Sequence, residues 1–229
     1  MSTSIIPQLV RKDLRLARGA ILTFGLVSLA AMLLVPLLHG HIPDWALINL
    51  GFILLVGPAA TCGIVLAMKT NVFEREKSTQ AFIMSLPVTM REYTHAKLLV
   101  NLPVFVVFWL AVSAVAFYLA FGLGLFPPGA APFITMVFLG VLVAYCCILS
   151  ASLVFQSLGA TVLAILLFEL ATSAYLWTVA YSEPIARHVY GATATWNATA
   201  LSIVAVQVVV AVAVIAATVH IQGAKRDCI

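Results

Sequence analysis

Six stretches of about 20 mostly apolar residues recur along this 229-residue chain, and they limit its possible folds more than any other feature. A helix rises 1.5 Å per residue, so about 20 apolar residues cross a hydrocarbon layer about 30 Å thick. We therefore predict an all-α membrane protein, with six transmembrane helices in a single domain over residues 1–229. The predicted spans cover residues 20–38, 46–68, 100–123, 132–153, 160–181 and 198–221.

The composition argues against a separate water-soluble domain. Hydrophobic residues make up 63% of the chain and charged residues only 9%, whereas soluble domains average about 25% charged residues. No polar stretch is long enough to form a domain of its own. The first apolar stretch is too long for the core of a signal peptide, and we expect it to remain in the protein as a span.

Basic residues lie almost entirely on one side of the predicted spans. If both termini are cytosolic, the only Lys or Arg on the outer side is Arg187. Cytosolic loops of membrane proteins carry such an excess of Lys and Arg. The sequence therefore predicts a multi-pass protein of the bacterial inner (cytoplasmic) membrane with cytosolic N- and C-termini. This asymmetry also explains the net charge of +4, so no nucleic-acid partner is needed.

A basic amphipathic helix is predicted over residues 5–18, before the first span. Asp13 falls on its apolar face, where a carboxylate needs a partner, and we expect a basic residue of the next cytosolic segment to supply one. The helix either lies in the cytosolic headgroup layer or is simply the basic flank of the first span. The apolar face carries Ile6, Leu9, Val10, Leu14 and Ala17, and the polar face carries Gln8, Arg11, Lys12, Arg15 and Arg18.

The cytosolic segment 69–97 is longer than a connection between two antiparallel helices needs to be. Residues 78–79, Ser-Thr, are suited to cap a short helix, and Pro87 is suited to end it. Residues 89–92, Thr-Met-Arg-Glu, have a capping-box pattern that starts a second helix leading into the third span. The short helix places apolar residues 81–84 in the aqueous layer, so it either contacts a partner protein or lies on the membrane surface.

Four strings in these cytosolic elements carry a family resemblance. They are Arg11-Lys12-Asp13-Leu14-Arg15, Phe73-Glu74-Arg75-Glu76-Lys77-Ser78-Thr79, Ser85-Leu86-Pro87-Val88-Thr89-Met90-Arg91-Glu92 and Lys97-Leu98-Leu99. With them the chain resembles the permease subunits of type-2 ABC (ATP-binding cassette) exporters. It looks most like the short six-span bacterial permeases of peptide and antimicrobial export systems, and the span pattern extends the resemblance over the full length.

The resemblance implies roles for particular segments. Residues 1–19 would form an elbow helix that includes Arg11, Lys12, Asp13 and Arg15, and residues 79–86 would form a coupling helix that docks on an ATPase subunit. Short extracellular helices would join the last two spans, one starting at Ser182-Glu183-Pro184 and ending at Gly191. The turn 155–159 carries no basic residue, which departs from the expectation of a second ATPase contact. The positions implied in ATPase coupling are Phe73, Glu74, Arg75, Glu76, Lys77, Ser78, Thr79, Phe82, Ile83 and Pro87.

The implied function is ATP-driven export of an amphipathic or apolar substrate, such as a peptide, an antimicrobial or a lipid-like molecule. The chain has no Gly-x-x-x-x-Gly-Lys-Ser/Thr loop, so we do not expect it to be an enzyme by itself. The resemblance implies two ATPase subunits that bind ATP and Mg, a second permease subunit, identical or related, and contact with membrane lipids. No cofactor is expected in this chain. No metal is expected either, since His39 and His41 alone offer too few ligands.

A polar stripe interrupts the fifth predicted span. Glu169 lies near its middle, where a charge costs roughly 2–4 kcal/mol. It shares one side of the helix with Thr172, Ser173 and Trp177, and Gln207 of the sixth span lies deep enough to meet it. These residues either line a translocation path or a dimer seam, or they form an interhelical hydrogen bond that positions two helices.

Two other functions are compatible with the sequence. One is a stand-alone secondary transporter that uses Glu169 as a proton carrier, although the chain has no convincing internal repeat of the kind such transporters often contain. The other is a non-transporting membrane immunity or scaffold protein, which would protect a cell without any ATPase.

Overall fold

A computed structural model describes residues 5–76 and 88–224 of the chain. Six of its helices are long and apolar enough to cross a membrane, which confirms the predicted number of spans and the all-α class. These helices are α1 (Ile6–Leu37), α2 (Asp44–Ala67), α5 (Met90–Phe117), α6 (Ala131–Phe155), α7 (Leu158–Tyr181) and α9 (Ala198–Ala224). The shorter elements are the π-helices η1 (Met68–Val72) and η2 (Tyr118–Gly122), the 3₁₀ helix η3 (Pro128–Ala130), α3 (Phe73–Glu76) and α8 (Glu183–Val189).

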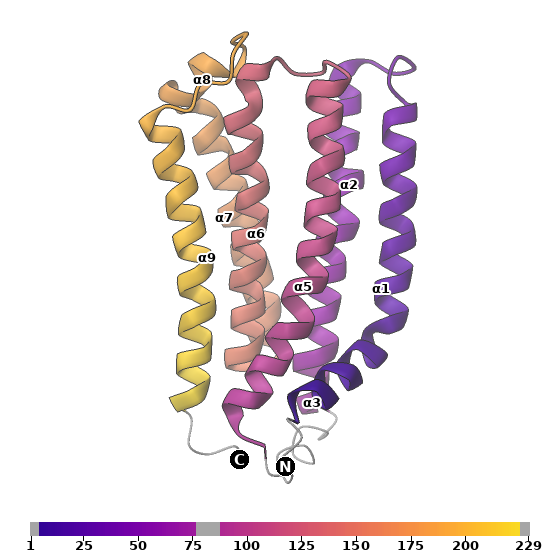
Figure 1. Cartoon of the computed structure of the whole chain (residues 1–229), viewed down its shortest axis with the longest axis vertical. Helices are drawn as coiled ribbons and strands as arrows, with labels where there is room; N and C mark the ends of the chain where they lie inside the picture. Colours follow the sequence, from indigo (N-terminus) through magenta and orange to yellow (C-terminus); the bar gives the residue numbers. More distant parts are fainter. Residues whose placement is uncertain (1–4, 77–87, 225–229) are drawn as a thin grey trace.

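The long helices run side by side, and α1 begins at the same end of the bundle at which α9 finishes (Figure 1). Helices α1, α2 and α5 pack against one another, and α6 packs against both α7 and α9. The two groups meet where α6 lies against α2 and α5, and where α5 touches α9. The bundle is therefore two three-helix groups joined along one seam.

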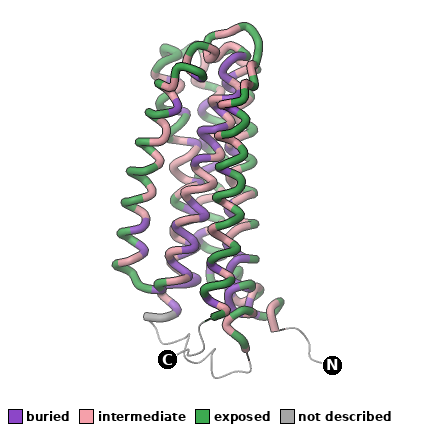
Figure 2. The backbone as a smooth tube through the Cα atoms, turned by 90° about the vertical axis from the view of Figure 1, so that its left-hand side faces the viewer, coloured by how far each residue is buried: buried purple, intermediate pink, exposed green. Residues whose placement is uncertain are grey.

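Apolar side chains fill the seam and also cover the outside of the bundle. Helix α6 is the most buried of the six long helices, and buried residues concentrate on the inner helices in Figure 2. On α1, by contrast, Leu26 and Leu33 are more than 60% exposed. Apolar residues on an outer surface are stable when hydrocarbon surrounds them, because lipid and core are equally apolar. This surface is consistent with a membrane-embedded bundle.

Helix α1 differs from the expected division into an elbow helix and a span. It runs unbroken from Ile6 to Leu37, and Figure 1 shows its first turns bending away from the direction of the rest. Nothing near residue 19 removes a backbone hydrogen bond, because the only internal proline is Pro36. The buried side of its first turns carries Leu9, Asp13 and Ala17, whereas Leu14, which we predicted on that side, is 39% exposed.

The second span also continues beyond its expected end. Helix α2 passes without a gap into η1 and α3, so the chain stays helical from Asp44 to Glu76. At the far side of residues 77–87, α5 begins at Met90 with the predicted capping box. The Thr89 hydroxyl accepts the Glu92 N–H at 3.2 Å, and Glu92 Oε2 accepts the Thr89 N–H at 2.9 Å, which confirms that prediction. The predicted coupling helix over residues 79–86 lies outside the described residues. The same holds for six of the predicted ATPase-coupling positions, Lys77, Ser78, Thr79, Phe82, Ile83 and Pro87.

A short helix starts at the predicted position between the last two spans. Helix α8 covers Glu183–Val189, and it lies at the end of the bundle opposite the start of α1 (Figure 1). The Gly129 N–H donates to the Gly191 carbonyl at 2.9 Å, so the turn before α6 is fastened to the turn after α8. Asn197 joins the same corner, because its Nδ2 donates to the Pro184 carbonyl at 2.7 Å.

We expect Gly129→Ala to disrupt this corner. A Cβ at Gly129 would stand 2.2 Å from the His188 carbonyl oxygen and 2.6 Å from that of Gly191, and backbone atoms cannot move aside cheaply. Such overpacking costs about 1–3 kcal/mol, so the variant should unfold at a lower temperature in detergent. Gly159→Ala is the matched control because nothing lies within 4 Å of its Cβ position. Equal unfolding temperatures for the two variants would contradict the prediction.

Candidate functional site

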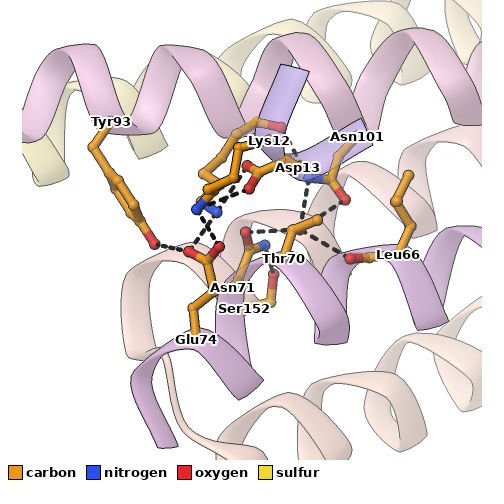
Figure 3. Close-up of polar contacts among 10 residues, drawn as sticks. Lys12, Asp13, Leu66, Thr70, Asn71, Glu74, Tyr93, Asn101 and Ser152 are labelled. Atoms are coloured by element: carbon orange, nitrogen blue, oxygen red, sulfur yellow. Dashed lines mark hydrogen bonds and ion pairs between the residues drawn. The ribbon is translucent and has the colours of Figure 1, made fainter. Parts of the chain in front are cut away.

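Four charged side chains meet at the end of the bundle where α1 begins (Figure 3). Lys97 of α5 places its Nζ 2.8 Å from Asp13 Oδ2 of α1 and 2.6 Å from Glu74 Oε2 of α3. Lys12 bridges the same two carboxylates from the other side, at 3.1 Å from Asp13 Oδ1 and 2.5 Å from Glu74 Oε1. We call Lys12, Asp13, Glu74 and Lys97 the charge cluster.

Three members of the charge cluster are almost completely hidden. Asp13 is 0% exposed, Lys97 is 1% exposed and Glu74 is 4% exposed. Removing a single charge from water costs several kcal/mol, and close ion pairs offset that cost only when every charge has a partner. Two ammonium groups and two carboxylates meet this condition, because their formal charges sum to zero.

Tyr93 completes the surroundings of the charge cluster. Its hydroxyl donates to Glu74 Oε2 at 3.2 Å, and its ring centroid lies 5.0 Å from Lys97 Nζ. Tyr93 and Lys97 are four residues apart on α5, so they share one face of that helix. An aromatic face attracts an ammonium group, so the ring offsets part of the cost of burying the Lys97 charge.

Glu74 stays ionised because of its two cationic neighbours. Burial by itself would raise the pKa of the Glu74 carboxyl, but the ammonium groups of Lys97 and Lys12 outweigh burial and hold that pKa below its usual range. A carboxylate with a lowered pKa in the folded state stabilises the fold at neutral pH and loses that contribution only in acid. The Glu74 carboxylate is therefore ionised at neutral pH and can pair with both ammonium groups.

The position of Asp13 answers a question that the sequence left open. We predicted a basic partner from the next cytosolic segment, and Lys97 belongs to that segment, so the prediction is confirmed. Lys12, which we assigned to the polar face, turns inward far enough to join the ion pairs and remains 37% exposed at its side chain. Arg11 and Arg15 are exposed on the opposite side of α1.

A network of neutral polar groups lies next to the charge cluster. Asn101 Nδ2 donates to the Thr70 hydroxyl at 3.0 Å and to the Lys97 carbonyl at 2.9 Å. Asn71 Nδ2 donates to the Ser152 hydroxyl of α6 at 2.9 Å. Thr70 and Asn71 belong to η1, and short π-helical turns of this kind occur often at functional sites. The network extends the polar contacts from α1, α3 and α5 to α6.

The structure describes four of the predicted ATPase-coupling residues, Phe73, Glu74, Arg75 and Glu76, all of them in α3. Phe73 is half-buried, and Glu74 points into the charge cluster rather than toward a surface where a partner would meet its charge. Arg75 and Glu76 are the last two residues of α3. Glu74 is therefore suited to holding the base of the bundle together, a role different from the flanking contact that the resemblance implies.

The predicted polar stripe of the fifth span is only partly brought together. Gln207 donates from Nε2 to the Met136 carbonyl and to the Tyr175 hydroxyl, each at 2.9 Å, so its described partners do not include Glu169. Thr172 donates to the Phe168 carbonyl of its own helix at 2.7 Å. Glu169 is exposed and borders a hollow together with Thr172 and Ser173.

Sequence reasoning missed the roles of Lys97, Tyr93, Asn71 and Asn101. A signal was present in the spacing of Tyr93, Lys97 and Asn101, which recur every four residues and therefore share one face of α5. The polar stripe on α5 and the carboxylate of Asp13 on the apolar face of α1 together indicate that these two helix faces pack against each other.

Within residues 5–76 and 88–224, no three His, Cys, Asp or Glu side chains lie together in a way that could hold a metal ion. No protein-family model, no curated protein and no solved structure matches this chain.

Proposed function

We propose that this chain is the membrane-spanning permease subunit of a type-2 ABC exporter in the bacterial inner membrane. The six apolar helices and the family resemblance of the cytosolic strings support this proposal. The observation that carries it is the charge cluster, because Glu74 and Lys97 belong to the two helices that bound residues 77–87. That segment is the one that the resemblance assigns to ATPase docking.

The charge cluster joins the two helices on either side of the proposed docking segment. A force applied to residues 77–87 reaches α3 on one side and α5 on the other. The Glu74–Lys97 ion pair, with 2.6 Å between Oε2 and Nζ, joins these two helices. Asp13 adds the start of α1 to the same unit. To pass a conformational change from an ATPase to the spans, packed elements must move together. The charge cluster allows α1, α3 and α5 to do so.

The finer parts of the proposal follow from the resemblance. The first turns of α1 act as the elbow helix, residues 79–86 act as the coupling helix, and α8 is the extracellular helix. Both termini lie in the cytosol. A second permease subunit, identical or related, completes the membrane part, and two ATPase subunits bind ATP and Mg below it. ATP binding closes the ATPase pair and shifts the permease between two conformations.

Affinity purification of the tagged chain from its native membranes, in a mild detergent, tests the proposal. We expect an ABC ATPase to co-purify with the wild-type chain and to be lost from Phe82→Asp, because a charge would be buried in an apolar contact. Tyr190→Asp is the matched control, since Tyr190 is 82% exposed beside α8 at the other end of the bundle. That variant should retain the ATPase.

Three results would contradict the proposal or one of its parts. If no ATPase accompanies the wild-type chain under conditions that preserve complexes, the chain is not a permease subunit of this kind. If the chain alone, in vesicles with a proton gradient across the membrane, transports a substrate, the alternative of a proton-coupled transporter that uses Glu169 is favoured. If Phe82→Asp keeps the ATPase, the assignment of residues 79–86 to docking is wrong.

A further inference from the structure

Two hollows adjoin in the seam between the helix groups. The first has a volume of about 240 Å³ and is lined almost wholly by apolar side chains of α2, α5 and α6, together with residues that follow α5. The second has a volume of about 150 Å³ and is lined by α2, α5, α6 and α7. Phe52 and Val56 of α2 line both, so the two hollows adjoin along α2, and we call them together the groove.

A carboxylate stands at the edge of this groove. Glu169 lines the second hollow beside Thr172 and Ser173. It lies about halfway along the 24 residues of α7, about 17 Å from either end of the helix at 1.5 Å per residue. Among the described residues, no ion pair or hydrogen bond reaches the Glu169 carboxylate. A charge at this depth needs a counter-charge, because hydrocarbon does not solvate it.

A second copy of the chain is poorly suited to supply that counter-charge. Helices α2, α6, α7 and α9 contain no Lys or Arg. Helices α1 and α5 carry theirs only at residues 11–18 and 91–97, near the charge cluster. Among the described residues, the middles of the long helices therefore offer an ionised Glu169 carboxylate no basic side chain, which leaves its complementary charge to a bound molecule.

We propose that the groove binds a compact lipophilic cation. The apolar body lies against Phe52 and Val56, the positive charge lies beside the Glu169 carboxylate, and the hydroxyls of Thr172 and Ser173 line the same wall. The two hollows together fall at the lower end of the range of about 300–1,000 Å³ typical of small-molecule sites, which fits a compact body. This inference rests on the proposed export function, for which it names the substrate class.

The test uses the full chain in nanodiscs of zwitterionic lipid, with radiolabelled tetraphenylphosphonium as the probe and empty nanodiscs to subtract partitioning into lipid. We expect saturable binding that weakens about tenfold in Glu169→Gln, equivalent to about 1.4 kcal/mol. Glu169→Asp keeps the charge and should keep most of the affinity. Asp44→Asn is the control, because Asp44 is an exposed carboxylate at the start of α2 that lines neither hollow.

A second variant tests the groove independently of the charge. Ala144 lines the hollow next to Glu169, so Ala144→Phe should fill that space and weaken binding while leaving the carboxylate in place. Neutral tetraphenylmethane, which has nearly the same shape, should compete poorly. Equal binding by the wild-type chain and Glu169→Gln, or equal competition by the neutral compound, would overturn the inference. If Glu169→Gln does not fold, Glu169→Asp, Ala144→Phe and the neutral competitor still decide the question.

The two proposals fail separately. The binding assay contains no ATPase, so a chain that binds the probe but never co-purifies with an ATPase contradicts only the proposed export function. A chain that co-purifies with its ATPase but binds the probe no better than empty nanodiscs contradicts only the lipophilic-cation site.

Discussion

Replacing Lys97 with Met is expected to destabilise the chain by about 3–5 kcal/mol, the usual effect of removing one partner from a buried ion pair. The substitution leaves Asp13 and Glu74 buried with only the half-exposed Lys12 between them. The measurement is the unfolding temperature of the purified chain in detergent. Lys69→Met is the matched control, since Lys69 takes part in no ion pair within the part of the chain that the structure describes.

A compensating change separates charge balance from packing in this result. Adding Asp13→Asn to Lys97→Met leaves Lys12 and Glu74 as one balanced pair, and we expect the double variant to unfold at a higher temperature than Lys97→Met alone. If Lys97→Met were no less stable than Lys69→Met, the charge cluster would not hold the base of the bundle together. If the double variant were less stable still, packing rather than charge balance would explain the effect.

Substituting Ala for Gly63 should produce the second large effect. A Cβ at Gly63 would lie 2.6 Å from Tyr145 Cε2 and 2.7 Å from Phe105 Cδ2. These two rings stack with centroids 3.6 Å apart, and both are at most 3% exposed. The Tyr145 hydroxyl also donates to the Asn101 carbonyl at 3.1 Å, so its ring has little freedom to retreat. We expect a loss of about 1–3 kcal/mol, the usual cost of overpacking a core.

The control for Gly63→Ala lies on the same helix. Nothing approaches within 4 Å of the Cβ position at Gly57, so Gly57→Ala adds a methyl group without a clash. Alanine is the better helix former by about 1 kcal/mol, and this variant should be neutral or slightly more stable in thermal unfolding. A common loss of stability in both variants would show that α2 tolerates no added methyl group, and the close approach of the ring pair would not be the cause.

The features that the sequence predicts well are those encoded within a short stretch of chain. Each span is a continuous apolar run, and the capping box at Thr89 needs only residues three apart. The start of α8 follows from a serine, an acidic residue and a proline in succession. Asp13 was recognisable as needing a partner because one carboxylate on an apolar helical face is costly wherever that face packs.

The remaining features depend on how distant helices pack, and the sequence pattern does not determine this. Lys97 lies far from Asp13 and Glu74 in the chain, and only the meeting of α1, α3 and α5 brings the three together. The π-helical turn η1 adds a residue to one turn, so it changes which side chains face α5 and α6. Gln207 meets Tyr175 rather than Glu169 because Tyr175 lies on the side of α7 that packs against α6.

The order of synthesis has a consequence for the charge cluster. Lys12 and Asp13 leave the ribosome first, Glu74 follows only after two helices have been made, and Lys97 comes last. Until Lys97 emerges, the charge cluster contains two carboxylates and one ammonium group. Its net negative charge opposes burial of the first turns of α1. The start of the chain therefore cannot complete its packing during early translation, and insertion of the third long helix is the step that closes the base.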